Sequence, residues 1–120
     1  MPEYMLLLYA TEPADEAESE ERWRELPLWD EITDSLREAG MLIRNAPLHS
    51  VVSATTVRVR GGETELTDGP FAVTKEMLAG YYLLECPDLD DALRAAARLP
   101  LARYGSVEVR PVMTHVHAAR

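Results

Sequence analysis

The ten residues TDGPFAVTKE, Thr67–Glu76, place two acids, a base and two hydroxyls around a stiff turn. Gly69 allows backbone angles that other residues avoid, and Pro70 fixes its own φ. Such a turn can aim the carboxylate of Asp68 into a cleft as a general acid or base, provided that burial raises its pKa toward neutrality. The same residues suit a purely structural turn in which Asp68 accepts hydrogen bonds from backbone amides. Both interpretations stay open on the sequence alone.

A second acid–base candidate is His49, which follows the strand predicted over residues 41–46. A histidine titrates near neutrality and is the usual proton-transfer residue, although it also serves as an ordinary polar strand end. If the loop after this strand lies at the same end of the sheet as the DGPF turn, His49 and Asp68 could form a dyad. The catalytic candidates are therefore Asp68 and His49.

Four further residues are candidates for substrate binding. Lys75 could bind an anionic group, and Glu76 could pair with Arg110 across the sheet, or these could be ordinary surface charges. We expect Thr74 to cap a short segment that begins at Lys75. Tyr9 could line a pocket for an aromatic compound, although aromatic residues at such positions also serve as core or dimer contacts. The other aromatic residues considered for this pocket are Tyr81, Tyr82 and Trp29.

The sequence offers no strong metal or cofactor motif. His115 and His117 have a spacing that suits two metal bonds from one face of a strand, but no third ligand is near them. No phosphate-binding glycine loop, flavin or nicotinamide fingerprint, Ser-His-Asp order or CxxC occurs. Cys86 is the only cysteine, so an internal disulfide is excluded, and we expect a small buried side chain there. We therefore expect no cofactor and no metal.

The charge balance argues against two classes of partner. The net charge is −9, with 21 acidic against 12 basic residues. Binding to nucleic acid needs clustered Lys and Arg, and an anionic membrane surface attracts the same residues. The apolar run Tyr4–Ala10 is too short for a signal peptide or for a membrane span of about 20 residues. We expect a cytoplasmic protein without nucleic-acid or membrane partners.

Hydrophobic periodicity predicts the order strand, helix, strand, hairpin, strand, helix, strand. Two β-α-β halves of this kind make a ferredoxin-like α+β sandwich, in which both helices cover one face of an antiparallel sheet. Pro27 either opens the first helix or kinks a longer one, and the acidic residues 12–25 are expected to be a loop or an exposed helical turn. Residues 1–114 are expected to form one domain, and 115–120 a tail. The predicted strands are 4–10, 41–46, 57–60, 64–67, 80–86 and 106–113.

Each predicted helix carries one apolar stripe with a spacing of three or four residues, which we expect to be buried. The stripe of the first helix is Trp23, Leu26, Trp29, Ile32, Leu36 and Ala39, and that of the second is Leu89, Ala92, Leu93, Ala96 and Leu99. The strands 4–10 and 81–84 do not alternate between apolar and polar residues, as strands with one wet face do. Because both helices are used on one face, the other face needs a second copy of the sheet. The sequence thus predicts a homodimer.

The segment TTVRVRGGETELTDGPFAVTKEMLAGYYLLECPDLDDALRAAARLP, followed by GSVEVRPVM, resembles the DGPF branch of the YCII-related proteins. The segments YMLLLY and REAGML fit the same family. The resemblance implies a dimeric α+β barrel, in a superfamily that includes muconolactone isomerases, cofactor-independent monooxygenases and haem-dependent members. It also implies two contexts: some YCII-related proteins act on chlorinated aromatics, and many DGPF proteins are encoded beside extracytoplasmic-function sigma factors.

One departure from the family limits what the resemblance implies about catalysis. The YCII branch is proposed to use a His–Asp pair with its histidine on the first helix, and this chain has no histidine between Trp23 and Gly40. We therefore expect a small homodimeric binding or regulatory module with a cleft near the DGPF loop, linked to a sigma factor. The alternative is a cofactor-independent enzyme (isomerase, dehydrochlorinase or monooxygenase-like) that acts on a small aromatic or lactone-like compound by proton transfer. A third possibility is an assembly domain in which the DGPF loop packs the dimer.

Overall fold

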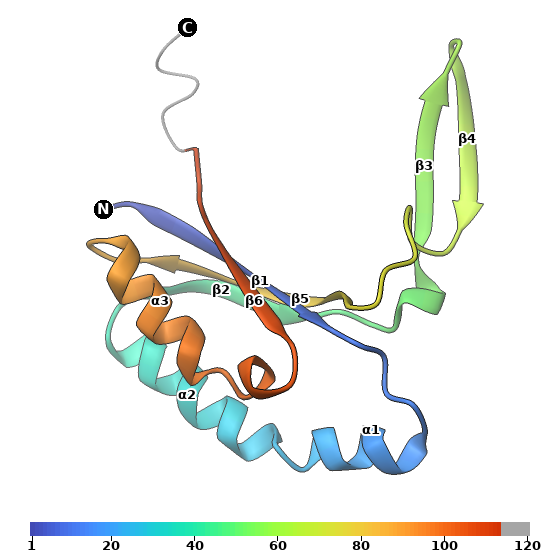
Figure 1. Ribbon diagram of the computed structural model, residues 1–120. Helices are drawn as coiled ribbons and strands as arrows, with labels where there is room; N and C mark the ends of the chain where they lie inside the picture. Colours follow the sequence, from blue (N-terminus) through green and yellow to red (C-terminus); the bar gives the residue numbers. More distant parts are fainter. Residues whose placement is uncertain (114–120) are drawn as a thin grey trace, which may run out of the picture.

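The computed structural model describes residues 1–113 of the chain. Four antiparallel strands form the main sheet in the order β2-β5-β1-β6, and helices α2 and α3 cover one of its faces (Figure 1). The predicted α+β class, the order of the elements and the placement of both helices on one face are confirmed. The strands are β1 (Glu3–Ala10), β2 (Leu42–Pro47), β5 (Met77–Glu85) and β6 (Ser106–Pro111), and the helices are α2 (Leu26–Glu38) and α3 (Leu89–Arg98).

Local sequence signals set the ends of these helices. Pro27 lies in the first turn of α2, which confirms that it opens the helix, and Gly40 leaves it with a φ of 74°. Asp88 caps α3, because its Oδ1 accepts a hydrogen bond of 3.0 Å from the backbone N–H of Asp91. Pro100 then begins a short 3-10 helix, η2 (Pro100–Arg103).

A further helix, α1 (Glu16–Trp23), occupies much of the acidic segment that the sequence placed as a loop or an exposed turn. The side chain of Asp15 caps it by accepting a 2.8 Å hydrogen bond from the backbone N–H of Glu18. No residue of α1 is buried. The sequence of α1 therefore shows no hydrophobic periodicity, and the capping residue Asp15 was the only sequence signal for this helix.

The core lies between the sheet and the helices α2 and α3. Leu6, Leu36 and Leu84 are among its fully buried side chains. The predicted stripes are only partly buried, because Trp23 and Leu89 are exposed to 69% and 44%. Helix α3 packs through a face of small residues, since alanine lets it approach the sheet closely. The residues of α3 that are buried are Ala92, Ala95 and Ala96.

The second face of the sheet has no cover within the described part of the chain. Side chains of β1 alternate between buried and half-buried, and Met5 and Leu7 belong to the half-buried set. In the strand register Met5 lies opposite Leu83 and Leu7 opposite Tyr81, so apolar residues fill the centre of this face. We call it the open face. Within residues 1–113 the strands are buried on the helix side only, and the cover that the sequence predicts on the other face, a second copy of the sheet, stays a prediction.

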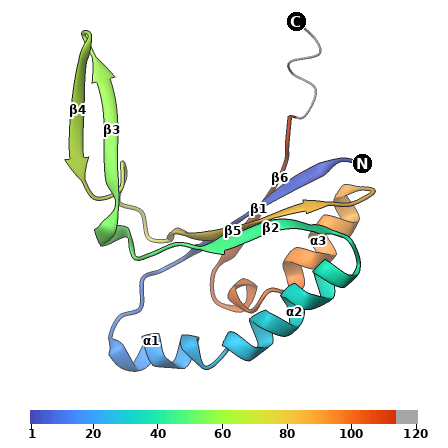
Figure 2. The same ribbon diagram turned by 180° about the vertical axis from the view of Figure 1, so that it is seen from behind.

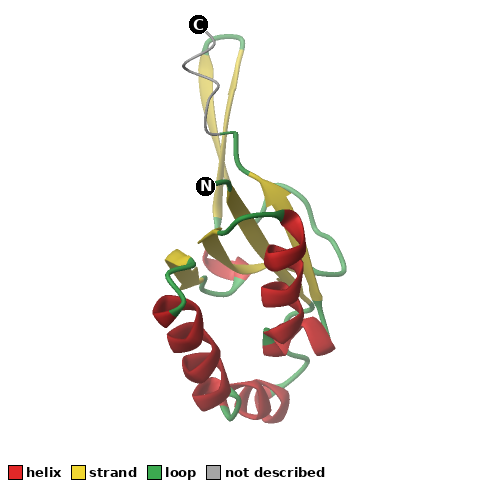
Figure 3. Ribbon diagram, turned by 90° about the vertical axis from the view of Figure 1, so that its left-hand side faces the viewer, coloured by secondary structure: helices red, strands yellow, loops and turns green. Residues whose placement is uncertain are grey.

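Strands β3 (Thr55–Arg60) and β4 (Glu63–Asp68) form a separate two-stranded sheet. Gly61 and Gly62 have φ values of 58° and 80° at its turn, which confirms the predicted Gly-Gly hairpin. The 3-10 helix η1 (Val51–Ser53) leads into it. We call residues 55–68 the arm. It projects from the body on the side opposite the helices (Figures 1, 2 and 3).

No helix within residues 1–113 is long and apolar enough to cross a membrane.

Candidate functional site

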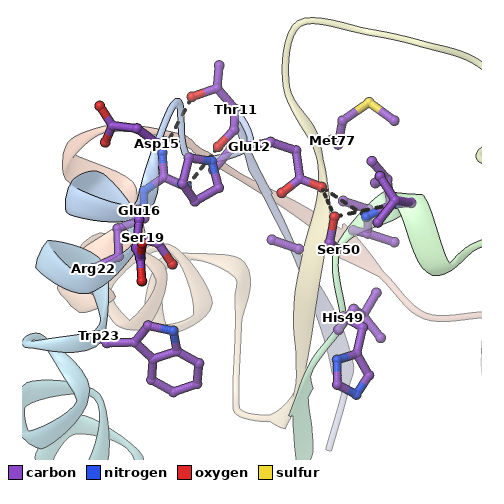
Figure 4. A pocket seen from close by; sticks show the side chains of 17 residues that line it. Thr11, Glu12, Asp15, Glu16, Ser19, Arg22, Trp23, His49, Ser50 and Met77 are labelled. Atoms are coloured by element: carbon purple, nitrogen blue, oxygen red, sulfur yellow. Dashed lines mark hydrogen bonds between the residues drawn. The ribbon is translucent and has the colours of Figure 1, made fainter.

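Two adjoining cavities lie between α1, α2 and the sheet. The sequence predicts a cleft near the DGPF loop, but no DGPF residue lines either cavity. One has a volume of about 670 Å³ and is bordered by α1 and the segment after β2 (Figure 4). The other has a volume of about 540 Å³ and reaches between α2 and the strands β2 and β5. Because the two share part of their lining, we call them together the cleft. The shared residues are Ala10, Pro13, Ser19, Arg22, Trp23 and Ala79.

Four aromatic side chains, Trp23, Trp29, Tyr82 and Tyr104, line the inner cavity. The rings of Trp29 and Tyr82 stack with centroids 6.2 Å apart and an interplanar angle of 21°. The hydroxyls of Tyr82 and Thr33 share a hydrogen bond of 2.7 Å. Burial raises the pKa of Tyr82 above its ordinary value, although hydrogen bonding to Thr33 acts in the opposite direction. Tyr82 is therefore a neutral phenol at physiological pH and can serve as a hydrogen-bonding group.

The floor of the inner cavity depends on a close approach of two strands at Gly80. A Cβ atom at this position would lie 2.8 Å from the carbonyl oxygen of Ala46 and 3.2 Å from the Cα of Pro47. Because both neighbours are backbone atoms, they cannot move aside without shifting β2. Gly80 thus lets β2 lie close to β5 where the two strands border the cleft.

Arg22 holds α1 against the segment that leaves β1. Its Nη1 donates a 2.8 Å hydrogen bond to the carbonyl oxygen of Thr11, and its Nη2 donates one of 3.0 Å to Glu18. The guanidinium also lies 4.9 Å from the ring centroid of Tyr104, which is within cation–π range. Burial raises the pKa of Tyr104, and the carboxylate of Glu25 acts in the same direction. Arg22 is therefore a structural part of the cleft wall.

His49 lines the outer cavity, as Figure 4 shows. The nearby carboxylate of Glu12 is engaged elsewhere, because its Oε1 accepts hydrogen bonds of 2.9 Å from the Ser50 hydroxyl and from the backbone N–H of Val51. This pair of bonds ties the segment after β1 to the segment after β2. His49 thus faces the cleft without a carboxylate aligned to it through a hydrogen bond.

Asp68 lies elsewhere, at the end of β4 in the arm, where it is exposed and lines neither cavity. Other groups hold its turn. The backbone N–H of Gly69 donates a 2.7 Å hydrogen bond to the carbonyl oxygen of Ala54. The Thr56 hydroxyl donates one of 2.8 Å to the carbonyl oxygen of Gly69. One chain therefore does not bring His49 and Asp68 together in its cleft. The catalytic roles of these two residues stay predictions.

Glu76 does not form the expected ion pair with Arg110. Its Oε1 accepts a 2.8 Å hydrogen bond from the hydroxyl of Ser106, while Arg110 lies 4.0 Å from the carboxylate of Glu108 on the same strand. The short segment expected after Thr74 is also absent. The Thr74 hydroxyl donates instead to the carbonyl oxygen of Glu76 at 2.6 Å, which closes a bend.

The remaining candidates lie outside the cleft. Tyr9 is half-buried on the open face of β1, opposite Leu78, and Lys75 is exposed in the loop before β5. His115 and His117 lie outside the described residues. Across residues 1–113 no group of three or more His, Cys, Asp or Glu side chains could hold a metal ion.

The sequence did not identify the polar residues of the inner cavity. Thr33 and Asn45 line it, and neither belongs to a motif. The only available signal was the helical spacing of Trp23 and Trp29, which we interpreted as part of a buried stripe. The end of that stripe extends past the core and lines the cleft instead.

Cys86 is fully buried, which confirms the expectation of a small buried side chain at this position. Burial raises the pKa of its thiol, and the negative charges of Asp91 and Asp88 act in the same direction. We expect a thiol reagent at pH 8 to label native Cys86 at least about 100-fold more slowly than in urea, because the thiolate forms only when the core opens. Rates of disulfide exchange with an aromatic disulfide reagent measure this. Equal rates in buffer and in urea would contradict the burial.

Comparisons with known proteins give two findings. Residues 3–115 match the profile of the YCII-related domain family. An uncharacterized protein of Rhizobium meliloti is 49% identical over 77 residues, a match that spans 62% of this chain and 62% of that protein.

Proposed function

Because the chain belongs to the YCII-related domain family, we propose that it is a homodimeric module that binds a small aromatic compound in the cleft. The observation that carries this proposal is the aromatic inner cavity, with Trp29 stacked on Tyr82. We further place the chain in the DGPF branch of the family, on the segment that surrounds Asp68. Because the DGPF residues 68–71 lie at the base of the arm and in the loop after it, and none lines either cavity, the proposed ligand site is separate from the motif.

The size and chemistry of the cleft support a small planar ligand. Volumes of about 670 and 540 Å³ lie in the range of small-molecule sites, which is roughly 300–1,000 Å³. Such sites combine apolar walls with a few polar groups that orient the ligand. Here Trp23 and Trp29 supply the walls. The hydroxyl pair of Thr33 and Tyr82, together with Asn45, supplies neutral polar groups, and the charged side chains of Asp30 and Arg37 also line this cavity.

The open face supports the homodimer. Met5, Leu7, Tyr81 and Leu83 form an apolar centre, and charged residues such as Glu108 stand on the flanking strand β6. An apolar centre with a polar rim is the usual anatomy of a protein–protein interface. A second copy, related by two-fold symmetry, supplies an identical surface, so that the two sheets pack face to face.

The alternative of a proton-transfer enzyme has weaker support. Asp68 lines neither cavity, and the raised pKa of Tyr82 keeps that phenol protonated. His49 is the one group of the predicted dyad that faces the cleft, so an enzyme of this kind would have to use it without Asp68 of the same chain. A partnership with an extracytoplasmic-function sigma factor remains a proposal that rests on the family resemblance.

Intrinsic fluorescence tests the binding proposal directly, because both tryptophans of the chain line the cleft. We expect benzoate, catechol or 4-chlorophenol to change the emission in a saturable way. Trp23→Ala should weaken that binding about 10-fold, since it removes one wall. The unfolding temperature should change little, because Trp23 is 69% exposed.

Phe71→Ala is the matched control, since Phe71 is 78% exposed and lines neither cavity. It should leave the dissociation constant within about 2-fold of the original value. Equal losses in the two variants, or no saturable change with any compound of the panel, would contradict an aromatic-binding cleft.

A further inference from the structure

One face of the arm, the apolar face, carries apolar side chains at its centre with Thr55, Thr64 and Asp68 beside them, and the other face is charged. In the register of β3 and β4, Val57 lies opposite Leu66, while the next residues along, Arg58 and Glu65, lie opposite each other on the other face. Val59 shares the apolar face. All three apolar side chains are exposed: Val57 to 60%, Val59 to 59% and Leu66 to 69%.

Such alternation is typical of a sheet that buries one of its faces. Every residue of β4 is exposed, and no helix or strand of the body lies over the apolar face of the arm (Figure 1). A lone two-stranded sheet has marginal stability in water, whereas a hairpin that packs its apolar side against another surface is stable. The sequence of the arm is therefore typical of an element that packs against another surface, but the described part of its own chain does not provide that surface.

The geometry of the body favours a second copy of the chain as that surface. The arm rises from the sheet on the side of the open face, away from the helices (Figures 1 and 3). Its six-residue strands span about 20 Å, whereas two facing sheets lie about 10 Å apart. A copy that covers the open face is thus flanked by the arm, which is long enough to extend past that copy's sheet.

The overall dimensions agree with a surface shaped to receive another subunit. The Cα radius of gyration is 16.6 Å. A compact domain of this length has a radius of about 14 Å. The open face and the arm meet as the two sides of a corner; the apolar residues of the arm are exposed and those at the centre of the open face are half-buried.

We propose that the arm of each protomer packs its apolar face, formed by Val57, Val59 and Leu66, against the body of the partner subunit. The proposal rests on the homodimer proposed above and adds a second region to its interface. Because a two-fold dimer contains two arms, a change in one arm residue acts twice. The charged face, with Arg58 and Glu65, stays in water.

Two double variants on the same strands test this assignment. Val57→Ser with Leu66→Ser removes the apolar pair, and Arg58→Ser with Glu65→Ser removes the opposing charged pair as a matched control. Sedimentation equilibrium measures the dimer dissociation constant of each. We expect the first variant to raise the constant at least about 100-fold, and the second to change it less than about 5-fold.

The outcomes separate this inference from the dimer proposal. Equal effects of the two double variants, or no effect of Val57→Ser with Leu66→Ser on a dimeric protein, would overturn the role of the arm and leave the sheet interface intact. A monomeric wild-type protein would overturn both. Hydrogen exchange of the unaltered protein gives a second readout that does not depend on how a variant folds. Amides of β3 and β4 should be protected above the dimer dissociation constant and exchange rapidly below it, and rapid exchange at both concentrations would also overturn the role of the arm.

Discussion

Gly105→Ala is expected to lower the unfolding free energy by about 3 kcal/mol or more, which is a large part of the roughly 5–15 kcal/mol that stabilises a domain. A Cβ atom at this position would lie 2.2 Å from the carbonyl oxygen of Tyr9 and 3.0 Å from a methyl of Leu101. The oxygen belongs to the backbone of β1 beside the start of β6, where Tyr9 pairs with Ser106. Relief of the clash therefore has to separate these strands. Thermal denaturation should show a midpoint lower by roughly 10 °C.

Gly40→Ala is the matched control for this change. Gly40 has a φ of 74°, so alanine is strained there, but its Cβ would have no neighbour within 4 Å. The expected cost is about 1 kcal/mol, from backbone conformation alone. If Gly105→Ala cost no more than Gly40→Ala, the close approach of β1 and β6 would be wrong.

Leu7→Lys is expected to convert the dimer into a monomer at micromolar concentration. Leu7 lies at the centre of the open face, between Tyr81 and Glu108 on the neighbouring strands. In the proposed dimer the change places two lysines in one apolar interface. Each substitution removes the burial of one leucine side chain, which contributes about 2 kcal/mol, and adds an unpaired charge. The dissociation constant should rise by at least about 1,000-fold. Light scattering should report the 13.5 kDa of one chain instead of twice that mass.

The control for this variant is Leu93→Lys, which makes the same chemical change on the outer side of α3. Leu93 is 46% exposed and lies on a helix that covers the opposite side of the sheet. It should leave the dimer intact. Dissociation by both variants would point to a general loss of stability. A dimer that survives Leu7→Lys would contradict the use of the open face.

Much of the fold could be predicted because its signals are local. The cap at Asp88, the stop at Gly40 and the Gly61–Gly62 turn each act within a few residues of the chain. The run of apolar residues in β1 also indicated correctly that the sheet has two apolar faces. Helix α1 was missed as a complete helix because it buries no residue and leaves no hydrophobic period.

The site could not be predicted in the same way because it depends on which distant segments meet. His49 faces the cleft and Asp68 does not, because Asp68 pairs with Thr55 at the base of the arm, outside both cavities. The pairing of Thr33 with Tyr82 joins residues of α2 and β5 that no short motif links. Trp23 has the helical spacing of a core residue, but it lies outside the core, is exposed and lines the cleft.

The pairing of β1 with β6 also has a consequence for biosynthesis. Strand β1 leaves the ribosome before the other strands of the described chain, whereas its neighbour β6, which begins at Ser106, is the last of them to leave. The apolar residues from Met5 to Leu8 therefore stay unpaired on the edge that later binds β6 until almost all of the described chain has been translated. We expect chaperone demand to be greatest during this delay, and a stalled nascent chain that ends before Ser106 to be prone to aggregation.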